Sequence, residues 1–169
     1  MPHLLLLRHA KSDWSDPALA DFDRPLAQRG RRAAPLLGRF IAEKKWRPDL
    51  VLCSSALRAR QTLDLVLPEL PVGPQVRFLR SLYLAPPSRM LSLLHRQPAA
   101  TGSIMVVAHN PGMEHLAFQL LGGTPPPAAR KMAEKFPTAA LAHFKVSSWS
   151  GLGGTPADLK DFVRPKDLA

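Results

Sequence analysis

Apolar runs alternate with amphipathic stretches along this chain, and the alternation limits the folds open to it more than any other feature. Uninterrupted apolar runs are typical of strands covered on both faces of a sheet. The predicted strands span residues 3–8, 49–53, 76–79, 104–108, 138–146 and 159–163, of which the last is a short edge strand. Strands separated by helical stretches predict an α/β fold, in which helices cover a central sheet.

The stretches between these runs carry apolar residues at helical spacing. The predicted helices span residues 26–46, 56–67, 88–96 and 111–121. Pro35 lies inside the first of them and is expected to kink that helix or delay its start. Two proline-containing segments, 11–25 and 123–137, are predicted to be loops.

Length and hydrophobicity restrict the class of protein. A chain of 169 residues suits one domain, spanning 1–169. Its 46% of hydrophobic residues and mean hydropathy of −0.08 exclude a disordered chain and a membrane protein. The apolar run at 4–7 is too short for a signal-peptide core or a membrane span, so we expect a cytoplasmic protein without membrane contact.

The chain is strongly basic, with 23 Lys and Arg against 13 Asp and Glu and a net charge of +10. Basic residues are scattered, the densest group being Arg29, Arg31 and Arg32, and aromatic residues make up 7% of the chain. This pattern indicates anionic partners without specific nucleic-acid binding. Cys53 is the sole cysteine, which excludes an intrachain disulfide and a cysteine-rich zinc site, and its apolar neighbours predict a buried core residue.

Polar side chains follow three of the predicted strands at the point where each strand ends. Arg8 and His9 follow the first strand, residues 54–58 follow the second, and residues 109–112 follow the fourth. The carboxyl ends of parallel strands form the edge where open α/β sheets bind ligands. We therefore expect Arg8, His9, Arg58 and His109 to converge on one pocket.

Two arginines and two histidines suit the chemistry of a phosphoryl group. Arginine offers planar, permanently charged donors that match phosphate oxygens. A neutral histidine can attack phosphorus, while a second histidine donates to the oxygens. Helix N-termini after Ser55 and Asn110 would add backbone donors. This chemistry requires no metal and no cofactor.

Four segments together resemble the histidine phosphatase superfamily, which is phosphoglycerate mutase-like, and in particular its SixA-like phosphohistidine phosphatase branch. The segments read LLLRHAKS at 5–12, RPLAQRG at 24–30, SSALRARQT at 54–62 and VVAHNPG at 106–112. The resemblance extends to the RPK at 164–166 and so spans nearly the whole chain. Ala10 stands where much of the superfamily has glycine, a minor departure that this branch shares.

The resemblance implies a fold, an activity and roles for individual residues. The fold would be a three-layer α/β/α sandwich with a mostly parallel central sheet. His9 would be the nucleophile that becomes phosphorylated, Arg8 and Arg58 would hold the phosphoryl oxygens, and His109 would complete the pocket. The protein would thus be a phosphatase, acting on a phosphorylated protein or a small phosphorylated substrate.

Further residues near these motifs are candidates for substrate binding. Lys11 and Ser15 lie in the loop after His9, from which either can reach the phosphate, although loop capping explains Ser15 equally well. Asn110 follows His109 at the start of the fourth predicted helix. Asp21 is expected to organise its loop, and Arg60 is expected to be a surface residue.

The residue that would protonate the leaving group is harder to identify from the sequence than the other site residues. Members that cleave phosphate esters resemble one another in carrying an acidic residue near the third strand, and residues 77–85 contain none here. A phosphohistidine needs less help because its imidazole leaves as a neutral group once protonated. Phosphohistidine in a protein is therefore the leading substrate. The other candidate donors are Asp13, Asp16, Glu69 and, first among them, Glu114, which also suits a helix N-terminus.

The sequence leaves two alternatives open. One is a small-molecule ester phosphatase or a mutase on the same fold, which would require a carboxylate donor. The other is a phosphate-binding module without catalysis.

Overall fold

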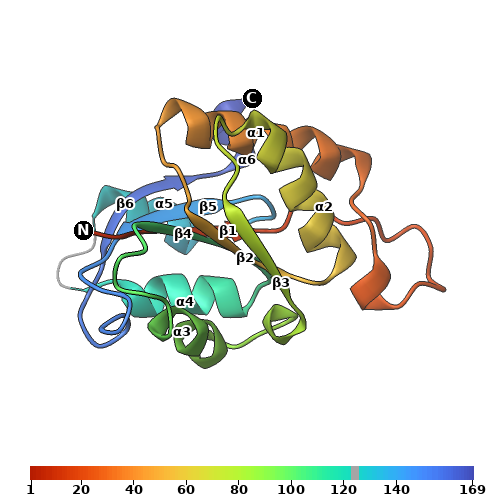
Figure 1. Ribbon diagram of the computed structural model, residues 1–169. Helices are drawn as coiled ribbons and strands as arrows, with labels where there is room; N and C mark the ends of the chain where they lie inside the picture. Colours follow the sequence, from red (N-terminus) through yellow and green to blue (C-terminus); the bar gives the residue numbers. More distant parts are fainter. Residues whose placement is uncertain (123–125) are drawn as a thin grey trace.

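The described part of the chain, residues 1–122 and 126–169, forms a six-stranded sheet in the computed structural model (Figure 1). The strands are His3–Arg8 (β1), Leu50–Ser54 (β2), Gln75–Leu79 (β3), Ser103–Ala108 (β4), Leu141–Lys145 (β5) and Asp158–Val163 (β6). Their order is β3-β2-β4-β1-β5-β6. All neighbours are parallel except β5, which is antiparallel to both β1 and β6, so the prediction of a mostly parallel sheet is confirmed.

Helices cover both faces of this sheet and make three layers (Figure 1). One face carries α1 (Gln28–Glu43), α2 (Leu57–Val66) and the short α6 (Pro165–Leu168). The other face carries α3 (Pro87–His95), α4 (Gly112–Leu120) and α5 (Pro127–Glu134). Single 3₁₀ turns lie at Asp21–Asp23 (η1), Leu67–Glu69 (η2) and Arg80–Leu82 (η3). The α/β/α sandwich is therefore present.

Alternate residues of β1 serve the two cores. Leu5 and Leu7 pack with α1 and α2, whereas Leu4 and Leu6 pack with α3 and α4. All four are fully buried, and burying each leucine contributes about 1.5–3 kcal/mol. Because successive side chains of a strand point to opposite faces, a strand sandwiched between two helical layers is apolar throughout. Cys53 is buried in the α1 and α2 core as predicted, and burial raises the pKa of its thiol.

Two proline-based expectations differ from the structure. Pro35 does not delay the first helix, which begins at Gln28 and continues through it, whereas the kink expected as the alternative stays a prediction. The predicted loop at 123–137 contains α5, which begins at Pro127; residues 123–125 of that prediction lie outside the described residues. Proline suits the first turn of a helix because the N–H it lacks would have no partner there. The proline run therefore precedes a helix instead of excluding one.

No helix among the described residues is both long and apolar enough to cross a membrane.

Candidate active site

The site lies at the carboxyl edge of β1, β2 and β4, the three adjacent strands in the middle of the sheet. The register pairs Arg8 with Ala108, so the residues that follow each strand, His9 and His109, emerge side by side. Their ring centroids are 5.1 Å apart. Arg58 comes from the first turn of α2, the helix that follows β2. The topology thus brings His9, His109, Arg8 and Arg58 to one edge of the sheet.

The hydrogen bond of the His9 ring decides which nitrogen is free to react. Nδ1 lies 2.7 Å from the carbonyl oxygen of Ala10, and a carbonyl can only accept, so Nδ1 carries the proton. Burial, reinforced by the charges of Arg58 and Arg8, lowers the pKa of His9 to about 3, although the bond to Ala10 opposes this. At neutral pH the ring is therefore uncharged, with a lone pair on Nε2.

The backbone around His9 is held from two sides. The N–H of Ala10 donates to Oγ1 of Thr62 at 2.9 Å, and the Thr62 hydroxyl donates to the carbonyl of Arg58 at 2.7 Å. On the other side the N–H of Ala139 donates to the carbonyl of His9 at 3.0 Å. Ala10 is fully buried and does not adopt a positive φ, so glycine is not required there. These bonds fix His9 relative to Arg58.

Arg58 is buried with its guanidinium against Nε2 of His9. Its Nε–H donates to Nε2 of His9 at 3.4 Å. The two terminal nitrogens bind Asp21, one at the carbonyl (2.6 Å) and one at Oδ2 (3.0 Å). Asp21 belongs to the η1 turn, and its two hydrogen bonds with Arg58 hold this turn at the site. The arrangement places a fixed positive charge beside the atom that would attack phosphorus.

Arg8 and Asn110 share one acceptor on the opposite side of the site. Arg8 donates to the carbonyl of Phe136 at 2.9 Å, and Nδ2 of Asn110 donates to the same oxygen at 3.0 Å. The Asn110 side chain also accepts from the backbone N–H of Glu114 at 3.1 Å. Nε of Arg8 is buried and has no partner among the described residues. This donor is therefore available to an incoming oxyanion.

His109 is held through one nitrogen and leaves the other free. Its Nε2 lies 2.7 Å from the hydroxyl of Ser54, whose oxygen accepts from the N–H of Ala56. The Ser54 O–H can therefore donate to Nε2, which leaves the single proton of the neutral His109 ring on Nδ1. Nδ1 is buried and has no partner among the described residues. Burial, with the nearby His9 and Arg58, lowers the pKa of His109 to about 3. The second histidine is thus also neutral at pH 7.

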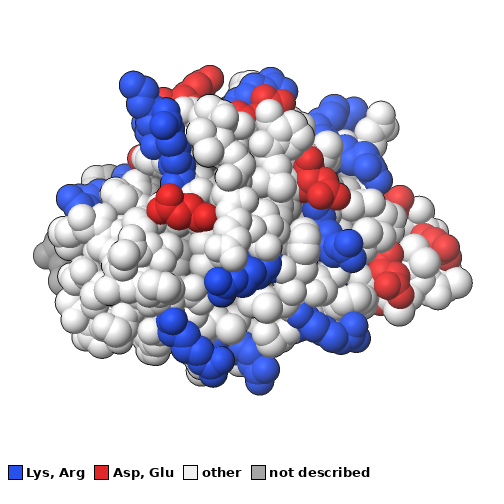
Figure 2. Space-filling view, viewed as in Figure 1, with Lys and Arg blue, Asp and Glu red and all other residues white. Residues whose placement is uncertain are grey.

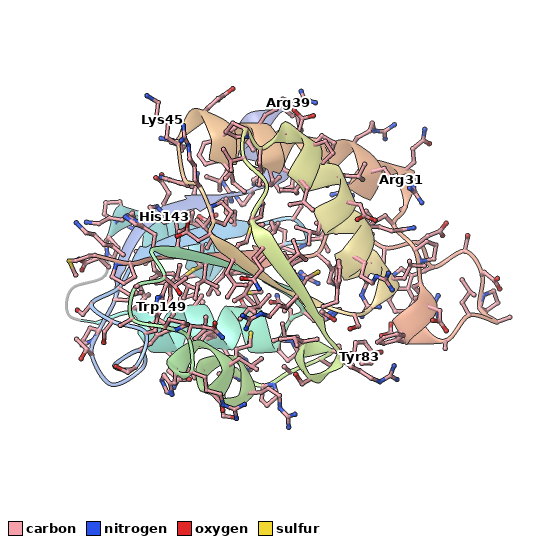
Figure 3. The ribbon with its side chains drawn as sticks, viewed as in Figure 1. Arg31, Arg39, Lys45, Tyr83, His143 and Trp149 are labelled. Carbon is pink, nitrogen blue, oxygen red and sulfur yellow. The ribbon has the colours of Figure 1, made fainter. Side chains whose placement is uncertain are left out.

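Asp21 and Tyr83 form a hydrogen-bonded pair at the rim of the site that our sequence analysis did not predict. The hydroxyl of Tyr83 donates to Oδ2 of Asp21 at 2.5 Å, and its ring stands edge-on to His109 at 5.4 Å. Figure 3 places Tyr83 just beyond the end of β3. Partial burial of Asp21 opposes its ionisation, but bonds from Tyr83 and Arg58 outweigh it and keep the pKa below its ordinary value. Asp21 is therefore a carboxylate at neutral pH and not a proton donor.

A signal for Tyr83 was present in the sequence. The rule that singled out the residues after β1, β2 and β4 also applies to β3, whose carboxyl end lies at the same edge and leads into residues 80–83. Asp21 was expected to organise its loop, and it also binds Arg58. Ser54 and Thr62 lie inside the segment 54–62, but their buried polar contacts could not be read from it.

Other predicted site residues lie apart from this cluster. Lys11 and Ser15 are exposed, and among the described residues no hydrogen bond joins either to Arg8, His9, Arg58 or His109. The backbone of Ser15 instead donates to the Asp13 carboxylate in a turn. Both remain predictions as substrate-binding residues. Arg60 is exposed, as expected.

The four carboxylates considered as proton donors are dispersed. Asp13 and Asp16 accept backbone bonds in the loop after His9, and Glu69 pairs with Arg39 at 3.5 Å. Burial lowers the pKa of the Arg8 guanidinium, and Glu114 lies near enough for its charge to oppose that shift. Among the described residues no group of three or more His, Cys, Asp or Glu is arranged to hold a metal ion.

Comparison with known proteins adds three observations. The family model of the histidine phosphatase superfamily (branch 1) matches residues 4–80. An uncharacterized protein of Mycobacterium tuberculosis is 37% identical over 163 residues, covering 95% of this chain and all of that protein. The crystal structure of a candidate phosphohistidine phosphatase SixA from Agrobacterium tumefaciens is 32% identical, with a TM-score of 0.83 over 98% of this chain and 99% of that one.

A second solved structure extends this likeness. A candidate phosphohistidine phosphatase SixA from Nakamurella multipartitia is 27% identical and has a TM-score of 0.85, covering 97% of this chain and 96% of that chain.

Proposed function

The chain belongs to the histidine phosphatase superfamily, in its SixA-like branch, and from that premise we propose that it hydrolyses phosphohistidine in proteins through a phosphorylated His9. The observation that carries the proposal is the state of His9. Its Nδ1–H is bound to Ala10 and its Nε2 lone pair faces the guanidinium of Arg58. A neutral, oriented imidazole beside a fixed positive charge is what attack on a phosphoryl group requires.

The first half-reaction transfers the phosphoryl group to His9. The Nε2 lone pair forms a bond to phosphorus as the bond from phosphorus to the substrate nitrogen breaks. Arg58, the free Nε–H of Arg8 and Nδ1 of His109 surround the transferred oxygens, and the two arginines offset their charge. The phosphorylated ring is a cation whose Nδ1–H becomes a stronger donor, and the Ala10 carbonyl accepts it.

The second half-reaction releases phosphate. Water attacks phosphorus, the bond to Nε2 breaks, and the lone pair returns to His9. Water loses one proton to the medium or to the released phosphate, so no residue has to store it. Because Nδ1 of His9 already carries a proton, the ring leaves phosphorus as a neutral imidazole and needs no further protonation.

The identity of the leaving group supports phosphohistidine over an ester. The structure adds Asp21 to the carboxylates near the site, but the bonds from Tyr83 and Arg58 keep it ionised. An alkoxide leaving group needs a positioned acid, which contributes about 10²- to 10⁴-fold in rate. The histidine of a phosphohistidine leaves as a neutral imidazole once its ring is protonated. The site is thus better suited to breaking a P–N bond.

Substrate preference tests this proposal. We expect kcat/KM for free phosphohistidine to exceed that for phosphoserine by at least about 100-fold, because the ester lacks the acid it needs. Both compounds are small amino-acid derivatives, so the comparison isolates the leaving group. Glu114→Gln serves as the control: it should leave phosphohistidine turnover unchanged if no carboxylate donor is used. Equal or better turnover of phosphoserine, lost in Glu114→Gln, would identify an ester phosphatase instead.

A further inference from the structure

A cavity lies beside the loop that follows His9, apart from the catalytic cluster formed by Arg8, His9, Arg58 and His109. It has a volume of about 260 Å³, and none of Arg8, His9, Arg58 or His109 lines it. Its walls come from the first turn of α1, the chain that follows α5, and the start of α6, which lies against α1 (Figure 1). We call it the basic pocket, because it is lined by Lys11, Arg29, Lys135, Arg164 and Lys166 and by no acidic residue.

The charges of the basic pocket are largely uncompensated. Arg164 is bound by Asp167 at 3.1 Å and by Glu134 at 3.5 Å. Within 1–122 and 126–169, no carboxylate lies within 4 Å of Lys11, Arg29, Lys135 or Lys166. Four like charges around one cavity repel one another, and this cost falls when an anion enters. The pocket is therefore built to accept negative charge.

The same segments form the pocket wall and support the nucleophile. Lys11 comes two residues after His9, and its carbonyl accepts from the N–H of Ala27 at 2.8 Å. A side chain at Gly30 would place its Cβ 2.3 Å from that carbonyl, so glycine allows α1 to approach the loop. On the other wall, Pro137 and Thr138 directly precede Ala139, whose N–H binds the carbonyl of His9. The basic pocket is therefore built on the same segments that hold His9 in place.

The cationic side chains of the basic pocket indicate whether it binds phosphate or carboxylates. The planar fork of arginine matches phosphate, but the fork of Arg164 is already occupied by Asp167 and Glu134. Three of the four uncompensated groups are lysines, which act as hydrated point charges on flexible stems. They are exposed and come from different segments. Such a spread of charges is complementary to several separate carboxylates more than to one phosphate.

We propose that the basic pocket docks an acidic segment, rich in Asp and Glu, that neighbours the phosphohistidine in the protein substrate. This proposal rests on the proposed function for its substrate and deepens it. The catalytic cluster would bind the phosphoryl group, and the basic pocket would select which phosphoproteins bind at the catalytic cluster.

The test compares two double charge reversals. Arg29→Glu with Lys166→Glu changes the basic pocket, whereas Arg31→Glu with Lys45→Glu changes the net charge equally at exposed positions outside it. Figure 3 shows Arg31 and Lys45 extending outward from the molecule. We expect the first pair to lower kcat/KM for an acidic phosphohistidine protein about 10-fold or more, mainly through KM, and the second to change it less than about 2-fold. Free phosphohistidine should be turned over equally by all three proteins.

Each other outcome counts against the pocket. Equal losses in both double variants would show that net charge alone steers the substrate. A matching loss with free phosphohistidine would make these residues part of the catalytic site. If the proposed function itself were wrong, the unaltered protein would not turn over free phosphohistidine, so the two failures can be told apart.

Binding of an Asp- and Glu-rich peptide tests the basic pocket even without turnover. The double variant Arg29→Glu with Lys166→Glu should abolish peptide binding. Tighter binding of pyrophosphate than of the peptide, measured by competition, would overturn the assignment to carboxylates.

Discussion

His9→Ala should lower phosphatase turnover by more than about 1,000-fold, because it removes Nε2, the protein atom that bonds to phosphorus in the proposed reaction. Arg8, Arg58 and His109 could still bind the phosphoryl oxygens, but no nucleophile would attack phosphorus. Turnover of free phosphohistidine, followed by phosphate release, measures the loss. The circular dichroism spectrum should be unchanged, since His9 fills a site at the edge of the sheet and not the core between layers.

His115→Ala is the matched control for this variant. His115 is an exposed histidine on α4, six residues beyond His109, and it should be replaceable without loss of turnover. Retention of activity in His9→Ala, or an equal loss in His115→Ala, would remove His9 from the nucleophile role.

Arg58→Ala should have the second largest effect, lowering kcat about 100- to 1,000-fold. The guanidinium is bonded to Nε2 of His9 and to Asp21, so its loss removes both a phosphoryl donor and the anchor of the η1 turn. Arg58→Lys should recover little, because an ammonium cannot bind Asp21 at two atoms while also facing His9. Single-turnover kinetics with free phosphohistidine measure the effect on the chemical step.

Arg60→Ala provides the control on the same helix. Arg60 is exposed and lies over the ring of Phe78, away from the histidines. Its loss should change kcat less than about 2-fold. If Arg60→Ala and Arg58→Ala lost activity alike, a general effect of charge on α2 would replace the specific role of Arg58.

The sheet was predictable because buried parallel strands have an unambiguous pattern. A run such as Leu4 to Leu7 has to be apolar at every position when helices cover both faces, and all four residues are buried. The helix at Pro127–Glu134 was missed because a proline run is typical of loops, and proline at a helix start gives the same sequence signal. The short α6 is stabilised by Asp167, which binds Arg164, a contact that no periodicity reveals.

The catalytic cluster was predictable in outline and not in its connections. The rule that strand ends meet at one edge placed Arg8, His9, Arg58 and His109 together. Tyr83 and Asp21 are 62 residues apart in sequence, and their bond depends on where η1 folds over the edge. Which nitrogen of His9 carries the proton also could not be inferred from sequence, because it depends on the geometry of the Ala10 carbonyl.

The basic pocket could not be predicted from the sequence, because its residues come from distant segments. Arg29 belongs to the densest basic group of the sequence, yet Arg31 points away while Lys166, more than one hundred residues distant, lies across the same cavity. Composition predicted an excess of charge but not its grouping. On the face shown in Figure 2, basic side chains lie in several separated groups, in agreement with a scattered distribution.

The central claim is that the phosphoryl group passes through Nε2 of His9, and trapping the intermediate tests it most directly. Unaltered protein is mixed with a labelled phosphoramidate and quenched in alkali, which preserves phosphohistidine. Mass spectrometry then locates the label, and NMR of the modified protein identifies the nitrogen. We predict one labelled phosphoryl group on His9, at Nε2, because Nδ1 is held by the Ala10 carbonyl. Label on Nδ1 or on another residue, or no label during steady turnover, would contradict the account.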